Sequence, residues 1–169
     1  MRKIIKLALI LAVICAISAG LLAYVYLFTA PKIDLNVKAA FEISLRQVLP
    51  AAEKFNPTKD KGIHAGLKGQ EKIGVAISVA PRGYAGQLEM LVGVNQDGKI
   101  EGLKVFRQKE TPGLGSKVTK NSFLNQFIGK SLKDKLEPKQ DIDAITGATI
   151  TSRAACKGVR EALEKAAKP

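Results

Sequence analysis

The sequence predicts an α+β fold class: an N-terminal transmembrane helix, then a compact domain with a twisted, largely antiparallel sheet packed by helices. Three features indicate it. A run of 22 uncharged residues lies near the N-terminus, strand-like alternation occupies the middle of the chain, and helical periodicity fills its last part. Strands that precede the helices, instead of alternating with them, favour α+β over a doubly wound parallel sheet.

The run from Leu7 to Phe28 contains neither a charge nor a proline. As a helix rising ~1.5 Å per residue it is roughly 33 Å long, enough to cross a hydrocarbon core of about 30 Å. Because Arg2, Lys3 and Lys6 precede it, a secretory signal peptide is the alternative. The apolar part of a signal peptide has only ~7–15 residues, and this run ends in aromatic residues typical of a membrane interface, so we expect a retained anchor.

The charges beside the run predict its orientation. The N-terminal flank is purely basic, and Lys and Arg close to a membrane segment tend to stay in the cytoplasm. The far flank carries Lys32 and Lys38 but also Asp34 and Glu42. We therefore expect a single-pass protein of the cell (inner) membrane, with its N-terminus in the cytoplasm and its main domain outside.

The chain is expected to have three parts: a cytoplasmic N-terminus and anchor (1–30), a connecting helix (31–50) and an extracytoplasmic domain (51–169). Pro31 marks a break or kink after the anchor, because proline lacks an N–H and cannot continue the helical ladder. A helix over 34–49 follows, and Pro50 ends it. Its apolar residues stand at helical spacing: Leu35, Ala39, Ile43 and Val48.

The middle of the chain predicts strands. Residues 53–70 read as a polar loop, because a proline and three glycines interrupt them. Strands are expected over 73–80, 87–94 and 99–106. The turn from Asn95 to Gly98 joins the last two strands into a hairpin, with Gly98 supplying a positive φ.

The last part of the chain predicts mostly helix. The expected elements are a short amphipathic helix over 123–132 capped by Ser122 or Asn121, a short strand over 142–145, and a final helix from Ser152 to about Ala167. Glu161 and Lys165 are spaced to pair across one turn of the final helix.

The charge of +12 does not indicate a nucleic-acid partner. Three of the cations precede the apolar run, so the remainder has an excess of nine. No basic run is interleaved with aromatic residues, and a domain outside the cytoplasm does not meet nucleic acid. A surface beside anionic membrane lipid that holds an anionic cofactor is the preferred interpretation.

The residue inventory excludes several kinds of active site. Cys15 in the anchor cannot meet Cys156 in the final helix, where a buried structural thiol is expected. The single histidine, His64, has no second His or Cys nearby, so neither a metal site nor a hydrolytic triad is indicated. Glycine-rich nucleotide loops are also missing from the sequence. Chemistry must therefore come from a cofactor.

One segment, Asp143 to Thr149, combines small residues with hydroxyls directly before the final helix. A helix start carries unpaired N–H groups and the positive end of the dipole, which suit a phosphate. Gly147 and Ala148 allow a bulky ligand to approach the backbone. The alternative is a Thr/Ser cluster that caps an ordinary helix.

The pattern Asp-x-x-Thr-Gly-Ala-Thr in this segment resembles the flavinylation motif of the FMN-binding domain family. That family includes the G subunit of Rnf-type ferredoxin:NAD oxidoreductases and the C subunit of the sodium-pumping NADH:quinone oxidoreductase. The likeness continues through Gly83-Tyr84-Ala85-Gly86 and through Glu110-Thr111-Pro112-Gly113-Leu114-Gly115, which is similar to the ETPGLG box of the Rnf G subunits.

The resemblance implies that a flavin transferase joins the phosphate of FMN to the hydroxyl of Thr149 as a phosphoester. Thr146, Gly147 and Ala148 complete the motif. Asp143 either orients Thr149 or assists the metal of the transferase, or it is simply a turn residue.

The two upstream motifs supply further candidate FMN contacts. Tyr84 either faces the isoalloxazine or is a half-buried loop aromatic. Glu110 and Thr111, with Leu114 in the same box, either contact the flavin or tie down the Pro-Gly turn.

The resemblance also implies a function, electron transfer within an Rnf-type complex that moves Na⁺ or H⁺. One membrane helix cannot form an ion path, so we expect polytopic subunits and an iron–sulfur protein as partners. The alternatives are the FMN subunit of a sodium-pumping NADH:quinone reductase type of chain, an extracytoplasmic reductase acting on a soluble substrate, and a flavin-binding sensor or assembly module without turnover.

Overall fold

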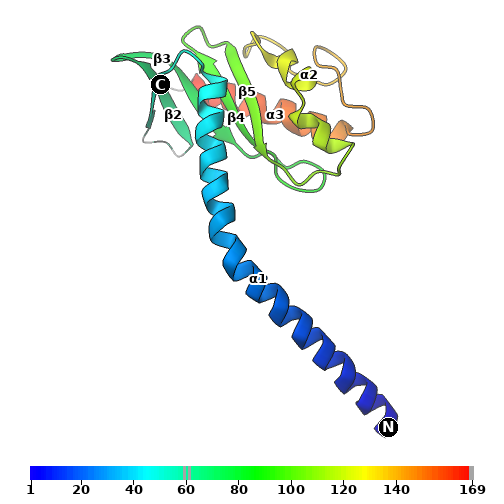
Figure 1. The fold of residues 1–169 in the computed structure, drawn as a ribbon. Coiled ribbons are helices and arrows are strands. Elements are labelled where there is room, and N and C mark those ends of the chain that lie inside the picture. Colours follow the sequence, from blue (N-terminus) through cyan, green and yellow to red (C-terminus); the bar gives the residue numbers. More distant parts are fainter. Residues whose placement is uncertain (59, 61, 168–169) are drawn as a thin grey trace. The chain divides into compact units, whose positions relative to one another are not determined.

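A computed structural model of the protein describes residues 1–58, 60 and 62–167. The chain forms two compact units, Met1–Ala39 and Ala40–Pro169. Helix α1 (Arg2–Val48) ends in the second unit, where a five-stranded antiparallel sheet and helix α3 (Thr149–Ala166) follow (Figure 1). The predicted α+β class, with a long apolar helix before the sheet, is confirmed.

The first unit is the N-terminal part of α1. It holds the one helix of the described residues that is long and apolar enough to cross a membrane, and its most apolar stretch is not buried in the protein. Of the predicted break or kink at Pro31, the break is wrong, because α1 continues through that residue. A proline inside a helix removes one hydrogen bond and costs ~3 kcal/mol or more, but regular bonding resumes on both sides of it.

The strands of the second unit lie in chain order, and each is antiparallel to the next. They are β1 (Lys54–Pro57), β2 (Ile63–Lys68), β3 (Glu71–Val79), β4 (Glu89–Asn95) and β5 (Ile100–Arg107). The last three agree with the predicted strands to within two residues. The turn between β4 and β5 is also as predicted, because Gly98 has a φ of 74° and Asn95 Oδ1 accepts hydrogen bonds from the N–H groups of Asp97 and Lys99.

Strands β1 and β2 correct the polar loop predicted over 53–70. The edge strand β1 is mostly exposed, so its sequence lacks the alternation that burial of one face imposes. Both strands owe their form to pairing, with Phe55 opposite Gly66 and Ala65 opposite Val75. His64, expected in a loop, lies on β2 and its ring contacts Phe41 edge-on at 5.3 Å between centroids.

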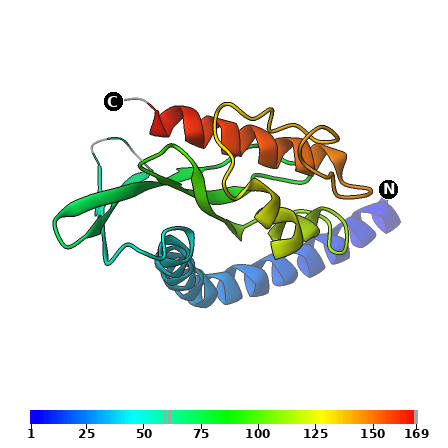
Figure 2. The same cartoon turned by 90° about the horizontal axis from the view of Figure 1, so that it is seen from above.

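The sheet is covered on both faces. Met90, Val92 and Val94 of β4 point into a core shared with α3, whereas Leu91 between them packs on the opposite face with Leu45 and Leu49. Figure 2 shows α3 and the last turns of α1 on opposite faces of the sheet. Alternate residues of a central strand thus serve two cores, as expected for a sheet without a solvent face.

The end of α1 differs from its predicted apolar stripe. Val48 is buried, but Ile43 is 58% exposed, and the buried neighbours are Leu45 and Leu49. Packing against the sheet, and not the apolar spacing of the helix alone, thus determines which face of α1 is buried.

Two glycines let the end of α1 lie directly on the sheet. Gly93 of β4 and Gly102 of β5 are directly opposite each other. A Cβ on Gly93 would overlap the carbonyl oxygen of Val48, and one on Gly102 would lie 2.5 Å from Val48 Cα. The backbones of helix and sheet are therefore in contact at this point, and no side chain fits between them.

The connection from β5 to α3 is less regular than predicted. It contains η1 (Gly115–Thr119), α2 (Asn121–Leu124) and η2 (Asn125–Phe127). The predicted helix over 123–132 is too long, because Ile128 is extended and Gly129 has a φ of 80°, which ends the helix. Neither Asn121 nor Ser122 is the cap, since Lys120 occupies that position.

The last two predicted elements differ in extent. The strand over 142–145 is reduced to an isolated parallel bridge between Ile142 and Pro138. Helix α3 begins at Thr149, three residues before the predicted Ser152. Its predicted ion pair is present, with Lys165 Nζ 2.8 Å from Glu161 Oε1.

Substitution of Gly93 by alanine is expected to destabilise the second unit. Because the new methyl group would push Val48 off the sheet, we expect the free energy of unfolding to fall by about 1–3 kcal/mol, measured by chemical denaturation in detergent. The matched control is Gly86→Ala, where the nearest atom to the new Cβ is Lys109 Cβ at 3.2 Å, a side-chain atom that can move. Equal losses in the two variants would contradict the close packing at Val48.

Candidate functional site

A pocket of about 570 Å³ lies where three segments distant in sequence meet. Its size is within the range of small-molecule sites, roughly 300–1,000 Å³. Its lining contains seven of the nine residues proposed from the sequence. The lining residues are Tyr84, Glu110, Thr111, Leu114, Gly115, Gly147, Ala148, Thr149, Ile150 and Thr151.

A second pocket, of about 720 Å³, lies at the other end of α3 beside the β4–β5 turn. It is larger but contains none of the three sequence motifs. The smaller pocket is therefore the candidate site, because it alone of the two gathers the residues with matching chemistry.

The first turn of α3 forms one wall of the candidate site. The chain enters it through Gly147, whose φ is 78°, and Ala148, and no side chain caps the helix. The first turn also contains no acidic residue. The N–H groups at the helix start and the positive end of its dipole thus remain available to an anion.

The four hydroxyls around this helix start divide into two kinds. Thr151 and Ser152 are buried: the hydroxyl of Thr151 donates to Glu110 Oε2 at 2.6 Å, and that of Ser152 donates to the carbonyl of Ala148 at 3.0 Å. Thr146 and Thr149 are exposed, but only Thr149 of these two lines the pocket. Of the hydroxyls around the helix start, Thr149 is therefore the exposed one that faces a ligand phosphate in the pocket.

Glu110 lies beneath the pocket and is only 5% exposed. One carboxylate oxygen accepts the hydrogen bond from Thr151, and the other accepts one from the N–H of Ala85 at 3.1 Å. Its own N–H donates to Gln108 Oε1 at 2.5 Å. Both oxygens are thus engaged by the protein itself.

The rest of the box from Glu110 to Gly115 forms a compact turn. The carbonyl of Thr111 accepts hydrogen bonds from the N–H groups of Leu114 and Ser116, each at 3.2 Å. Gly113 has a φ of 77° and its N–H donates to Ser116 Oγ at 2.9 Å. This turn presents Leu114 to the pocket.

Apolar side chains form an exposed rim around the pocket. Tyr84 is 70% exposed, Ile150 55% and Leu114 45%. A Cβ on Gly147 would lie 3.2 Å from Leu114 Cδ2, so glycine keeps this side of the pocket open. A planar aromatic group with a phosphate fits this arrangement, with apolar contacts at the rim and donors at the helix start.

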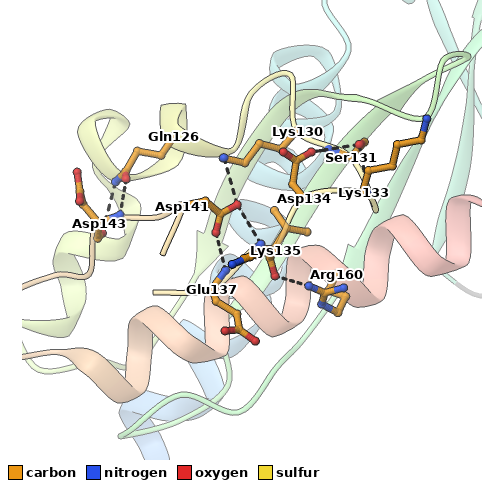
Figure 3. Close-up of polar contacts among 11 residues, drawn as sticks. Gln126, Lys130, Ser131, Lys133, Asp134, Lys135, Glu137, Asp141, Asp143 and Arg160 are labelled. Atoms are coloured by element: carbon orange, nitrogen blue, oxygen red, sulfur yellow. Dashed lines mark hydrogen bonds and ion pairs between the residues drawn. The ribbon is translucent and has the colours of Figure 1, made fainter. Parts of the chain in front are cut away.

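Asp143 and Thr146 do not line the pocket. The backbone of Asp143 is held by Gln126, whose Oε1 accepts from the Asp143 N–H at 2.7 Å and whose Nε2 donates to its carbonyl at 3.5 Å (Figure 3). The Asp143 side chain is exposed. The sequence did not indicate Gln126, because nothing about a glutamine on a short helix predicts a contact with a residue 17 positions further along the chain.

The segment that leads into the motif is fixed by Asp141. Its Oδ2 accepts hydrogen bonds from Leu136 N at 3.0 Å and Lys130 Nζ at 3.2 Å, and its Oδ1 accepts one from Glu137 N at 2.9 Å (Figure 3). Leu136 is buried with a φ of 50°, a conformation that is costly for a residue with a side chain. The contacts of Asp141 offset that cost.

Two residues with reactive side chains lie outside the pocket. Cys156 is buried on α3, as expected, and burial raises the pKa of its thiol to about 12. Burial also lowers the pKa of His64, whose Nδ1 is buried without a partner in the described part of the chain. Neither residue contributes to the candidate site.

Comparison with known proteins identifies two matching family models. Residues 83–164 match the FMN-binding domain, and residues 1–48 match the RnfG N-terminal region. The first match contains all three sequence motifs that meet at the pocket.

Curated relatives match over most of their length. The chain is 38% identical to the G subunit of the proton-translocating ferredoxin:NAD(+) oxidoreductase complex of Clostridium ljungdahlii, over 92% of this chain and 87% of the relative. It is 34% identical to the G subunit of the Na(+)-translocating ferredoxin:NAD(+) oxidoreductase complex of Acetobacterium woodii, over 96% and 91%.

Among solved structures, the C subunit of the Na(+)-translocating NADH-quinone reductase of Parabacteroides distasonis has a similar fold. The TM-score is 0.50 at 24% sequence identity, and the match covers 60% of this chain and 58% of that one. This likeness concerns the fold alone.

Replacement of Asp141 by asparagine is expected to destabilise the segment before the motif. Burial raises the pKa of Asp141, but the hydrogen bonds from Glu137 and Leu136 and the Lys130 ammonium outweigh it, so the pKa lies below its ordinary value of 3.8. A lowered pKa means that the carboxylate stabilises the fold at neutral pH, and that this contribution is lost as pH falls through the folded-state pKa.

At pH 7 we expect Asp141→Asn to lower the free energy of unfolding by about 1–3 kcal/mol, because an amide NH₂ cannot accept a hydrogen bond. The difference from wild type, measured by denaturation at several pH values, should shrink below pH 4. Asp97→Asn in the exposed β4–β5 turn is the control. A difference that stays constant from pH 7 to pH 3 would contradict the role of the Asp141 charge.

Proposed function

The chain belongs to the FMN-binding domain family and carries the N-terminal region of RnfG proteins, and from this premise we propose that it carries covalently bound FMN as an electron-transfer subunit of an Rnf-type membrane complex. In this proposal electrons pass between FMN and neighbouring redox partners, and the complex couples ferredoxin:NAD chemistry to the movement of Na⁺ or H⁺. The names of the relatives support the same assignment.

The observation that carries the proposal is the exposed Thr149 hydroxyl at an uncapped helix start in the pocket. Thr149 would form the phosphoester, and the first-turn N–H groups of α3 would bind the remaining phosphate oxygens. Gly147 and Ala148 would let the phosphate approach the backbone. Bound FMN would supply one- and two-electron transfer, which no side chain of this pocket provides.

The rim residues would hold the flavin ring. Tyr84, Leu114 and Ile150 line the pocket and present exposed apolar surface to it. Burying these side chains against an aromatic ring removes apolar surface from water, which favours binding. Asp143 and Thr146, outside the pocket, would act in recognition by the flavin transferase.

The lining favours a relay over an independent reductase. Glu110 and Tyr84 are the ionisable residues of the pocket, and both oxygens of Glu110 are engaged by the protein. No lining residue of the described pocket is thus placed to bind and protonate a second, soluble substrate. A single apolar helix also supplies no ion path, so polytopic subunits and an iron–sulfur protein are the expected partners.

Covalent attachment is expected at Thr149. Protein made together with a flavin transferase should remain fluorescent after denaturing electrophoresis, and Thr149→Ala should lose this signal because the acceptor oxygen is gone. Ser122→Ala, which removes an exposed hydroxyl outside the pocket and outside the three motifs, should stay fluorescent. A dark wild-type band, while the transferase modifies a control protein, would refute the linkage.

The proposed orientation places the N-terminus in the cytoplasm and the FMN domain outside. Protease added to sealed spheroplasts should therefore degrade residues 32–169, because the basic flank before Leu7 is retained inside. The measurement follows a C-terminal tag together with a cytoplasmic reporter. Protection of the tag in sealed spheroplasts would reverse the orientation.

Membership of a complex predicts co-purification. Tagged protein at native expression should emerge with several polytopic subunits and an iron–sulfur protein, identified by mass spectrometry. A matched preparation of Thr149→Ala should contain the same partners, because the substitution changes the cofactor and not the fold. Protein that emerges alone, and whose FMN turns over with a soluble substrate, would favour the reductase.

A further inference from the structure

The pocket is formed by three segments that are distant from one another in the sequence. They are the loop at Gly83–Gly86, the turn at Glu110–Gly115 and the first turn of α3. The side chain of Glu110 contacts all three, and it is the buried polar group at their junction.

Both carboxylate oxygens of Glu110 accept a hydrogen bond from another segment. Oε1 accepts the N–H of Ala85 at 3.1 Å, and Oε2 accepts the hydroxyl of Thr151 at 2.6 Å. Thr151 is 1% exposed and lies 41 residues from Glu110 in sequence. A buried carboxylate whose oxygens both accept hydrogen bonds holds its two donors at fixed positions, because leaving either oxygen unpaired is costly.

Two motif glycines make room for this carboxylate. A Cβ on Gly83 would overlap Oε1, and a Cβ on Gly115 would lie 2.6 Å from Oε2 and 3.0 Å from Thr151 Oγ1. Neither glycine has a positive φ, so space and not backbone conformation requires them. Gly83 and Gly115 thus leave the space that the side chain of Glu110 occupies.

We propose that Glu110 is a positioning residue: its buried carboxylate locks the loop of Tyr84 and the first turn of α3 to each other and thereby sets the place of Thr149. This deepens the proposed function and rests on it in one respect, the modification of Thr149. Thr151 stands two residues after Thr149 in the same turn, and Tyr84 directly precedes Ala85. One side chain therefore fixes both the acceptor hydroxyl and the aromatic residue of the rim.

Four variants test the proposal in the full-length protein. Glu110→Ala removes both acceptors, whereas Glu110→Gln preserves shape: its oxygen can accept from Ala85 and its NH₂ can donate to the hydroxyl of Thr151. Thr151→Val removes the hydroxyl and retains the branched shape. Glu164→Ala, an exposed carboxylate on α3, is the control.

The first measurement is amide hydrogen exchange of flavin-free protein in detergent. Glu110→Ala should speed exchange on the order of tenfold at the hydrogen-bonded N–H groups of Gly83, Ala85 and Ser152, because the loop and the helix start lose their common partner, and leave β3 and β4 unchanged. Glu110→Gln should lie close to wild type. Adding Thr151→Val to Glu110→Ala should cause no further change in the helix turn, since both remove one contact.

The second measurement is the rate at which a flavin transferase modifies each variant. Glu110→Ala and Thr151→Val should be slowed on the order of tenfold, and Glu110→Gln should recover most of the rate. Unchanged exchange at both segments, or an equal increase throughout β3 and β4, would overturn the proposal that Glu110 holds the two segments together. Faster local exchange with a normal modification rate would overturn its effect on Thr149. A wild type that is never modified would refute the proposed function. The exchange pattern would still show whether Glu110 holds the two segments together.

Discussion

The buried carboxylate of Glu110 and its hydrogen bond from Thr151 connect the two halves of this domain where the pocket forms. The loop after β5 supplies Glu110 and α3 supplies Thr151, so this hydrogen bond adds to the apolar packing between the sheet and the helix. Apolar packing sets the distance of a helix from a sheet but tolerates small sliding movements. A short hydrogen bond to a buried charge restricts that sliding, and the position of the helix start depends on it.

Which hydroxyls of the site are exposed depends on which ones are used in hydrogen bonds within the fold. Thr151 and Ser152 use their hydroxyls within the fold, which leaves Thr149 exposed at the same helix start. The first turn of α3 itself contains no acidic residue. On the far face of the sheet, the close approach of Val48 to Gly93 anchors the end of α1, so both faces of the sheet are constrained. The scaffold is rigid beneath the pocket, while the rim residues above it remain accessible to a cofactor.

Sequence reasoning found the parts of this fold whose signals are local. The alternation along β4, the Asn95–Gly98 turn and the periodicity of α3 each depend on residues close in sequence, and the structure confirms them. It failed where strand pairing or a tertiary contact determines the local structure. Strand β1 is mostly exposed and β2 is half-buried, and the form of both comes from their partners. Two hydrogen bonds join residues far apart in sequence. Asp143 N–H donates to Gln126, 17 positions away, and the Thr151 hydroxyl donates to Glu110, 41 positions away. A single sequence provides no signal for either contact.

Attachment of FMN to Thr149, the exposed hydroxyl of the helix start that lines the pocket, can be tested in a single peptide. Cleavage after Lys139 and Arg153 releases residues 140–153, which contain Thr146, Thr149, Thr151 and Ser152 together. Tandem mass spectrometry of protein made with a flavin transferase should place the FMN mass on Thr149, with Thr151 and Ser152 unmodified because they are buried. FMN on Thr146, or on either of the two buried hydroxyls, would contradict the account.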